Sequence, residues 1–245
     1  MSASLRRWLR KSVPAPLRLH LALALRRLRD NATGAAQEMA GCGQAGPGAG
    51  ATPERVNVTQ PIRRSEHFEG KLANLALAAQ RLHLVSVPPG KLLSFWKLVG
   101  EPSQANGFAL GRAIRADAVA ADIGGGLCQI SGLAYELGLR AGLEIVERHP
   151  HSQDLYTEQT RFTPLGLDAT VVWGHKDLRL RNGGAEPVVF GFAVTAEEIS
   201  GRVWGGLAAD IRIERRDDAA SGERHVTVWR GAERVSRDVY RVARG

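Results

Sequence analysis

Three consecutive glycines, Gly124-Gly125-Gly126, precede a helical pattern that begins with Leu127-Cys128. Glycine has no Cβ atom, so this turn can take left-handed backbone angles and lets other segments approach closely. The cysteine would lie in the first turn of the helix, where unpaired amide groups and the helix dipole favour negative charge. Such a position lowers the pKa of a thiol and raises its thiolate fraction. The stretch therefore makes Cys128 a candidate nucleophile.

Composition is that of an ordinary globular protein. The 245 residues are 44% hydrophobic and 24% charged, which is enough for one large domain with appendages. The two cysteines, Cys42 and Cys128, give no disulfide framework. No apolar run approaches the ~18–20 residues that a membrane-spanning helix needs.

The net charge of +8 is concentrated at the N-terminus. Residues 1–31 hold eight basic side chains and one acidic one, which leaves a charge of +1 for residues 32–245. This distribution argues against nucleic acid as a partner. Leucines alternate with the arginines, so we expect a basic amphipathic tail over residues 1–31, with a short helix at 17–29. That helix would contact an anionic membrane surface, dock on the body or remain solvated.

The N-terminal segment has no clear signal peptide. Arg6-Arg7 hints at a twin-arginine signal, but the apolar stretch Leu19–Leu25 is short and runs into further arginines. The default expectation is therefore a cytoplasmic or peripheral membrane protein. Residues 32–55 have the composition of a flexible linker, and the folded body is expected to begin near Val56.

The body has helical patterns first and strand patterns later. Apolar residues recur at helical spacing over 72–84 and 127–141. Candidate strands are 143–146, 169–173, 178–181, 187–194, 200–204, 210–215, 224–230 and 234–242. This order predicts an α+β fold, in which the Cys-bearing helix packs on a mostly antiparallel β-sheet and the C-terminal half is β-rich.

A histidine and an aspartate downstream complete a possible catalytic set. Cys128, His151 and Asp168 fit a thiol nucleophile, an imidazole base and a carboxylate that orients the base. Each also has a structural explanation, since cysteines are often buried and aspartates often cap turns. The glycine run favours the catalytic interpretation, because it is costly for packing alone. Candidate substrate-binding residues in these segments are Gly124, Gly125, Gly126, Gln129, Ser131, Arg148, His149 and Ser152.

Other chemistry is less well supported by the spacing. His149 and His151 on a strand would share one face, and Cys128 or Asp168 would then complete a zinc site. No second cysteine lies near, so we predict no metal and no other cofactor. Arg148 would bind a substrate carboxylate or pair with a neighbouring glutamate. The glycines lack the lysine and spacing of a phosphate-binding P-loop.

Several separated segments, in order along the chain, resemble the core of the VanW family. They are residues 89–95, 99–100, 124–131, 141–152, 164–171 and 177–182. The resemblance covers a VanW-like domain at 56–205 and leaves 206–245 as a C-terminal β extension. The family takes its name from glycopeptide-resistance gene clusters.

The resemblance implies a role at the cell wall. Some members look like L,D-transpeptidases that crosslink peptidoglycan stem peptides with a catalytic cysteine. On this chain that role would fall on Cys128, with His151 as the matching histidine, and the partner would be a peptidoglycan peptide or precursor. The alternatives are a non-catalytic accessory or peptide-binding protein and a zinc-binding scaffold.

Overall fold

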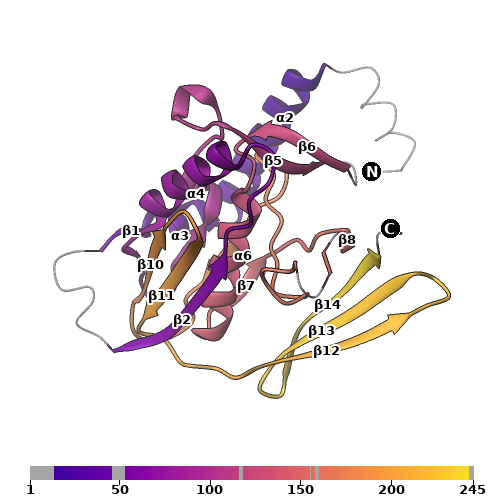
Figure 1. Ribbon diagram of the computed structural model, residues 1–245. Coiled ribbons are helices and arrows are strands. Elements are labelled where there is room, and N and C mark those ends of the chain that lie inside the picture. Colours follow the sequence, from indigo (N-terminus) through magenta and orange to yellow (C-terminus); the bar gives the residue numbers. More distant parts are fainter. Residues whose placement is uncertain (1–13, 46–52, 116–117, 155, 158–159, 243–245) are drawn as a thin grey trace.

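The computed structural model describes residues 14–45, 53–115, 118–154, 156–157 and 160–242 (Figure 1). The helices are α2 (Ala15–Ala32), α3 (Ala35–Ala40), α4 (Phe68–Leu82), α5 (Phe95–Val99), the 3-10 turn η1 (Gln104–Asn106) and α6 (Leu127–Arg140). The strands are β1 (Gly43–Gln44), β2 (Glu54–Pro61), β3 (Val85–Val87), β4 (Leu92–Ser94), β5 (Leu110–Arg115), β6 (Ala118–Ile123), β7 (Glu144–Glu147), β8 (Gln153–Asp154), β9 (Arg179–Arg181), β10 (Val188–Val194), β11 (Glu198–Trp204), β12 (Ile211–Asp218), β13 (Glu223–Arg230) and β14 (Glu233–Val242). The predicted α+β class and the β-rich C-terminal half are confirmed.

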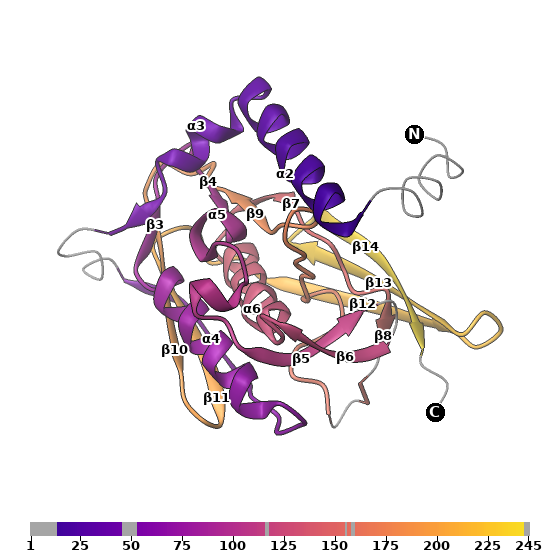
Figure 2. The ribbon, with the colours of Figure 1, turned by 90° about the horizontal axis from the view of Figure 1, so that it is seen from above.

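The Cys-bearing helix α6 lies at the centre of the molecule. It packs against β11 and β2 of an antiparallel five-stranded sheet with the order β1-β3-β10-β11-β2, and α4 lies beside it (Figure 2). Leu133 and Leu137 are fully buried and face Gly201 of β11, where a side chain would collide with them. The helix that carries the candidate nucleophile is therefore held by core packing along its whole length.

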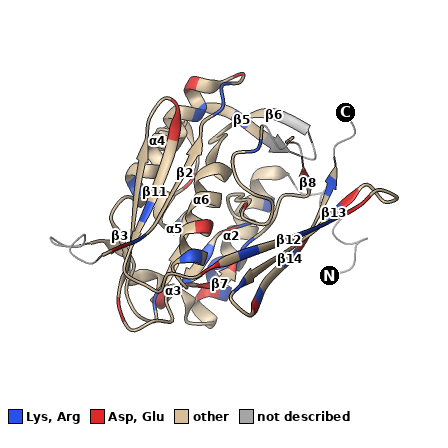
Figure 3. Cartoon of the chain, turned by 60° about the horizontal axis from the view of Figure 1, so that its bottom comes forward, with Lys and Arg blue, Asp and Glu red and all other residues tan. Residues whose placement is uncertain are grey.

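Three smaller sheets surround this layer. β4, β9 and β7 form one, β5 and β6 form a hairpin, and β12, β13, β14 and β8 form a fourth (Figure 1). Basic and acidic residues are interspersed along β12 to β14 (Figure 3), and exposed pairs such as Arg215–Asp217 lie on the solvent side. The inner side contributes Val226, Val228 and Tyr240 to the same hydrophobic core as α6. Strands β13 and β14, which lie in the expected extension at 206–245, thus contribute to the same core as the preceding residues.

The expected strand at 169–173 is absent: this part of the chain makes only an isolated bridge between Val172 and Lys176. Its backbone forms hydrogen bonds outside any strand ladder, since the Thr170 N–H donates to the carbonyl of His149. The sequence patterns also missed β2 and the β5–β6 hairpin. β2 is the edge strand of its sheet and buries few side chains, so its hydrophobic alternation is weak.

The segment expected to be a linker is partly structured. Residues 35–40 form α3, and Ala35 and Met39 pack on the buried Leu92. Glu38 of α3 pairs with Arg181 of β9. These contacts give residues 35–44 a fixed place that composition alone does not reveal. Residues 46–52 lie outside the described part of the chain.

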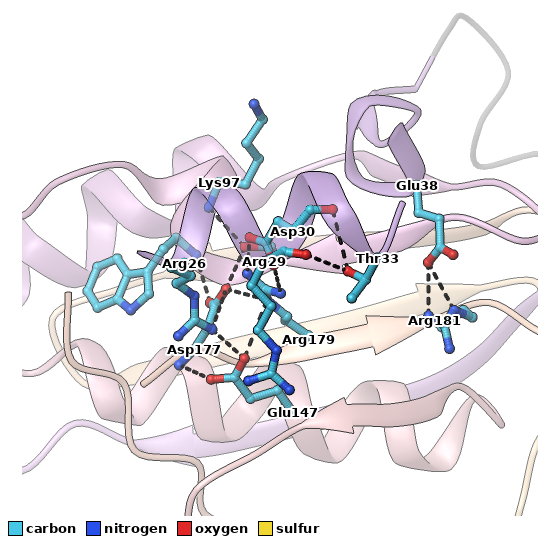
Figure 4. A network of polar contacts seen from close by, with 12 residues as sticks. Arg26, Arg29, Asp30, Thr33, Glu38, Lys97, Glu147, Asp177, Arg179 and Arg181 are labelled. Carbon is cyan, nitrogen blue, oxygen red and sulfur yellow. Dashed lines mark hydrogen bonds and ion pairs between the residues drawn. The ribbon is translucent and has the colours of Figure 1, made fainter. Parts of the chain in front are cut away.

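The N-terminal helix α2 docks on the body through ion pairs (Figure 4). Arg26 pairs with Glu147 of β7, and both oxygens of Asp30 accept from Arg179 of β9 at 2.6 and 2.7 Å. Leu19 packs on Gly174, whose Cβ position would lie 2.6 Å from the leucine Cδ1. The expected helix at 17–29 is therefore an integral part of the fold. No helix among the described residues is long and apolar enough to cross a membrane.

Replacement of Asp30 by asparagine tests this docking. Asp30→Asn removes the charge that faces the partly buried Arg179, and we expect a loss of about 2 kcal/mol in the free energy of unfolding. Urea denaturation measures it. Glu233→Gln, which alters the exposed pair with Arg230, is the matched control and should cost much less. Equal losses in both variants would contradict a stabilising role for the α2 contact.

Candidate active site

The glycine turn between β6 and α6 is shaped by close backbone contacts. Gly126 has a φ of 100°, which favours glycine, and a Cβ on Gly125 would collide with the backbone of Gly111. The fully buried Asn74 of α4 holds the turn, because its Nδ2 donates to the carbonyls of Gly125 at 2.9 Å and Ala109 at 3.0 Å. Larger residues at position 125 are therefore excluded by the fold, as the glycine run suggested.

Cys128 is the second residue of α6 and keeps part of its surface exposed. The neighbouring amides of Leu127 and Gln129 donate to backbone carbonyls within the turn. Within the described structure, the N–H of Cys128 has no backbone acceptor. This amide is thus available beside the thiol. The thiol lies 3.9 Å from the Val171 carbonyl, to which it can donate, and the side chain of His151 is close enough to act on the pKa of the thiol.

His151 is oriented by the buried Asp168. Its ring Nδ1 lies 2.7 Å from Asp168 Oδ2, and its backbone N–H donates to the same oxygen at 2.7 Å. With Nδ1 held in this way, Nε2 is the ring nitrogen left for Cys128. The structure brings together the three residues that the sequence singled out, in the order thiol, imidazole and carboxylate.

A second set of side chains fixes Asp168. Arg148, whose side chain is only 4% exposed, donates to Asp168 Oδ1 at 3.0 Å and also pairs with Asp238. The Tyr240 hydroxyl donates to Asp168 Oδ1 at 2.6 Å and accepts from the Gly166 N–H at 3.0 Å. The carboxylate therefore has hydrogen-bond donors on both oxygens.

The C-terminal sheet is part of this site. Tyr240 and Asp238 lie on β14, and the loop before Asp168 packs on β13, since a Cβ on Gly166 would lie 2.7 Å from Val228. Sequence reasoning missed both β14 residues. They lie far along the chain in an ordinary strand pattern, and nothing local distinguishes them from other strand residues.

The charges of the three residues depend on one another. Burial raises the pKa of the Cys128 thiol, but the hydrogen bond and charge of His151 outweigh it, so this pKa lies below its ordinary value. Burial lowers the pKa of His151, whereas the hydrogen bonds to Asp168 and Cys128 raise it to about 10. Burial also opposes ionisation of Asp168, yet His151 and Arg148 hold its pKa well below the usual range. These shifts all act in the direction that favours a thiolate–imidazolium pair beside a carboxylate.

Several other candidate binding residues have structural partners. Ser131 is fully buried and donates to the Ala169 carbonyl at 2.6 Å, and Gln129 donates to the Pro61 carbonyl at 3.0 Å. Arg148 pairs with Asp168 and Asp238 in place of the glutamates we considered, which leaves its guanidinium no free edge for a substrate. His149 and Ser152 are on the surface side of the same loop, and His149 contacts Glu147 at 3.0 Å.

The zinc interpretation required His149 and His151 to share a strand face. β7 ends at Glu147, so both histidines lie in the loop that follows, and their rings contact different carboxylates. No group of three or more potential ligands suited to a metal ion occurs among the residues that the structure describes.

The comparisons with known proteins agree with the sequence resemblance. The family model described as "VanW like protein" matches residues 70–204, more than half of the chain. This chain belongs to the VanW-like family. The matched region contains the glycine turn, Cys128, His151 and Asp168, whereas Asp238 and Tyr240 of β14 lie beyond it. No solved structure matches the VanW-like chain significantly.

Two curated relatives were found in bacteria. The chain is 33% identical over 116 residues to the uncharacterized protein YoaR of Bacillus subtilis, which is 47% of this chain and 37% of YoaR. It is 33% identical over 114 residues to the vancomycin B-type resistance protein VanW of Enterococcus faecalis, which is 46% of this chain and 42% of that protein. The matched part therefore spans well under half of either relative.

The pH dependence of thiol alkylation tests the charge state of the site. We expect the rate of Cys128 alkylation by iodoacetamide to be half-maximal below the ordinary thiol value of about 8.5, because the His151 imidazolium stabilises the thiolate. Below this midpoint the rate falls, because acid protonates the thiolate. Above the midpoint the rate stays level until the histidine deprotonates near pH 10. In His151→Ala, burial and the negative charge of Asp168 remain, and both raise the pKa of the thiol, so we expect the midpoint to move above the ordinary value.

Two features keep this measurement specific. Burial raises the pKa of Cys42 to about 11, so this thiol stays protonated over the tested range, and Cys128→Ser should abolish the reaction at neutral pH. A midpoint at or above 8.5 that does not respond to His151→Ala would contradict the ion pair.

Proposed function

We propose that this chain is a cysteine acyltransferase that acts on the stem peptides of peptidoglycan through Cys128. The observation that carries the proposal is the grouping of Cys128 in the first turn of α6 with His151, which is hydrogen-bonded to Asp168 and acts on the thiol. The cell-wall substrate is supported by a relative whose name is that of a vancomycin resistance protein.

In the first step the thiolate attacks a peptide carbonyl. A C–S bond forms, the electron pair of the C=O bond moves to oxygen, and the unpaired Cys128 N–H is placed to stabilise that oxyanion. When the carbonyl re-forms, the C–N bond breaks, and the leaving amine takes the proton of the His151 imidazolium. The products are a thioester on Cys128 and a neutral His151.

In the second step an acceptor amine attacks the thioester. His151, now neutral, takes a proton from this amine, a new C–N bond forms and the C–S bond breaks. The thiolate–imidazolium pair is restored, so no net proton or electron is consumed. Asp168 stays ionised throughout and holds the imidazole in one orientation. Water in place of the amine would give hydrolysis.

Mass spectrometry of the intact protein tests the acyl-enzyme. We expect incubation with a disaccharide tetrapeptide from peptidoglycan to add the mass of the acyl fragment to Cys128, and hydroxylamine to remove it. His151→Ala should slow adduct formation by about 100-fold or more, since the proton transfer to the leaving amine is lost.

The control separates chemistry from binding. Cys128→Ser should bind the same peptide but form no hydroxylamine-sensitive adduct. Peptide binding without an adduct in the wild-type protein would indicate an accessory, non-catalytic role. No adduct, together with unchanged crosslinks in muropeptide profiles of cells expressing wild type or Cys128→Ala, would overturn the proposal.

We also propose that α2 contacts an anionic membrane surface. Leu17, Leu21, Leu25 and Leu28 are 50–66% exposed, and their spacing places them on one helical face, away from Leu19 and Asp30, which contact the body. The sequence around this face is strongly basic, which complements anionic lipid headgroups.

Vesicle sedimentation tests this contact. We expect the protein to bind phosphatidylglycerol vesicles and to bind phosphatidylcholine vesicles poorly. The double variant Leu21→Ser, Leu25→Ser should bind at least tenfold more weakly because it removes two apolar side chains from the interface. Leu207→Ser changes a leucine that is 78% exposed outside α2 and serves as control. Equal binding by both variants would contradict the proposal.

A further inference from the structure

Two basic side chains beside the glycine turn have no acidic partner among the residues that the structure describes. The buried arginine Arg148 pairs with two carboxylates and Arg179 pairs with three. Lys71 of α4 and Arg112 of β5 are also partly buried, yet within the described part of the chain their side chains form no hydrogen bond or ion pair. Partly buried cations without an acidic partner lose some of their hydration and are suited to bind an anion.

Both residues lie against the glycine turn that leads to Cys128. The Cγ atom of Lys71 is 2.7 Å from the position that a Cβ on Gly126 would occupy. The backbone nitrogen of Arg112 is 2.8 Å from the corresponding position at Gly125. The absence of side chains in the turn therefore brings α4 and β5 close to the start of α6.

The charges of these residues act on one another and reach the thiol. Burial and the charge of Arg112 together lower the pKa of Lys71 to about 8. The charge of Arg112 also acts on Tyr156, as does that of the Cys128 thiolate. The charges of Lys71, Arg112 and Cys128 thus act within one neighbourhood that includes Tyr156.

We propose that Lys71 and Arg112 bind a carboxylate of the acyl-donor peptide, next to the carbonyl that Cys128 attacks. The assignment of a donor peptide rests on the proposed function, whereas the anion site itself rests on the two unpaired cations. A guanidinium offers paired N–H donors that match a carboxylate, and the ammonium adds a second positive charge. The site would then prefer donor peptides with a free carboxylate, because a donor in which this carboxylate is masked would leave both cations unpaired.

Alkylation with a charged and a neutral reagent tests the anion site directly. Iodoacetate and iodoacetamide attack the same thiolate, so the ratio of their rates is independent of the thiolate fraction. We expect Lys71→Gln and Arg112→Gln each to lower this ratio at Cys128 by roughly fivefold, through loss of one nearby positive charge. The charge-preserving variants Lys71→Arg and Arg112→Lys should retain the wild-type ratio.

The control is Lys97→Gln on α5, which removes an exposed lysine elsewhere and should not change the ratio. Circular dichroism verifies that the variants are folded. An unchanged ratio in Lys71→Gln and Arg112→Gln would overturn the anion site, whether or not the protein proves to be an acyltransferase.

A second measurement identifies the anion. The rate of Cys128 acylation is compared for a stem tetrapeptide and its carboxamide form. In the wild-type protein we expect the acid to react at least tenfold faster than the carboxamide. In the Arg112→Gln variant we expect the two peptides to react at the same rate. Equal rates in wild type would overturn the carboxylate assignment. If the two peptides react at equal rates and inorganic pyrophosphate inhibits the acylation of Cys128, the ligand of the anion site carries a phosphate instead.

Discussion

The buried carboxylate of Asp168 is the contact on which the site depends. It accepts from the ring and the backbone N–H of His151 on one oxygen, and from Arg148 and Tyr240 on the other. A buried carboxylate is tolerated only when it is neutralised and its lone pairs are satisfied. The donors come from two segments, the loop after β7 that carries Arg148 and His151 and the strand β14 that carries Tyr240, so the charge of Asp168 requires its own loop, that loop and the C-terminal sheet to lie together.

The N-terminal helix supports the other side of the same site. Leu19 and Leu23 of α2 pack on Gly174, close to the segment whose Val171 carbonyl lies 3.9 Å from the thiol. The ion pairs of Arg26 and Asp30 hold α2 over β7 and β9. The helix that carries exposed leucines is thereby linked through packed side chains to the rim of the site, and membrane contact would set the orientation of the thiol relative to the lipid surface.

Much of this arrangement could be predicted from sequence, where local signals are strong. The glycine run and the helical spacing after it placed Cys128 in the first turn of α6, and alternating apolar residues marked β10 to β14 within a few positions. Local sequence patterns did not predict the elements whose structure depends on tertiary contacts. β2 is a polar edge strand, and α3 forms because Ala35 and Met39 reach Leu92 from a segment with linker composition. Tyr240, Lys71 and Arg112 have no local pattern that associates them with a thiol far along the chain.

The central claim is that Cys128 and His151 form a thiolate–imidazolium pair at neutral pH. Nitrogen NMR of the protein labelled in its histidines reports the protonation of each His151 ring nitrogen directly. The account predicts that both nitrogens of His151 are protonated at neutral pH and that this signal titrates near pH 10. In Cys128→Ser the charged partner is lost, and the His151 pKa should fall. A neutral His151 that titrates at the ordinary value of about 6.5 in both proteins would contradict it.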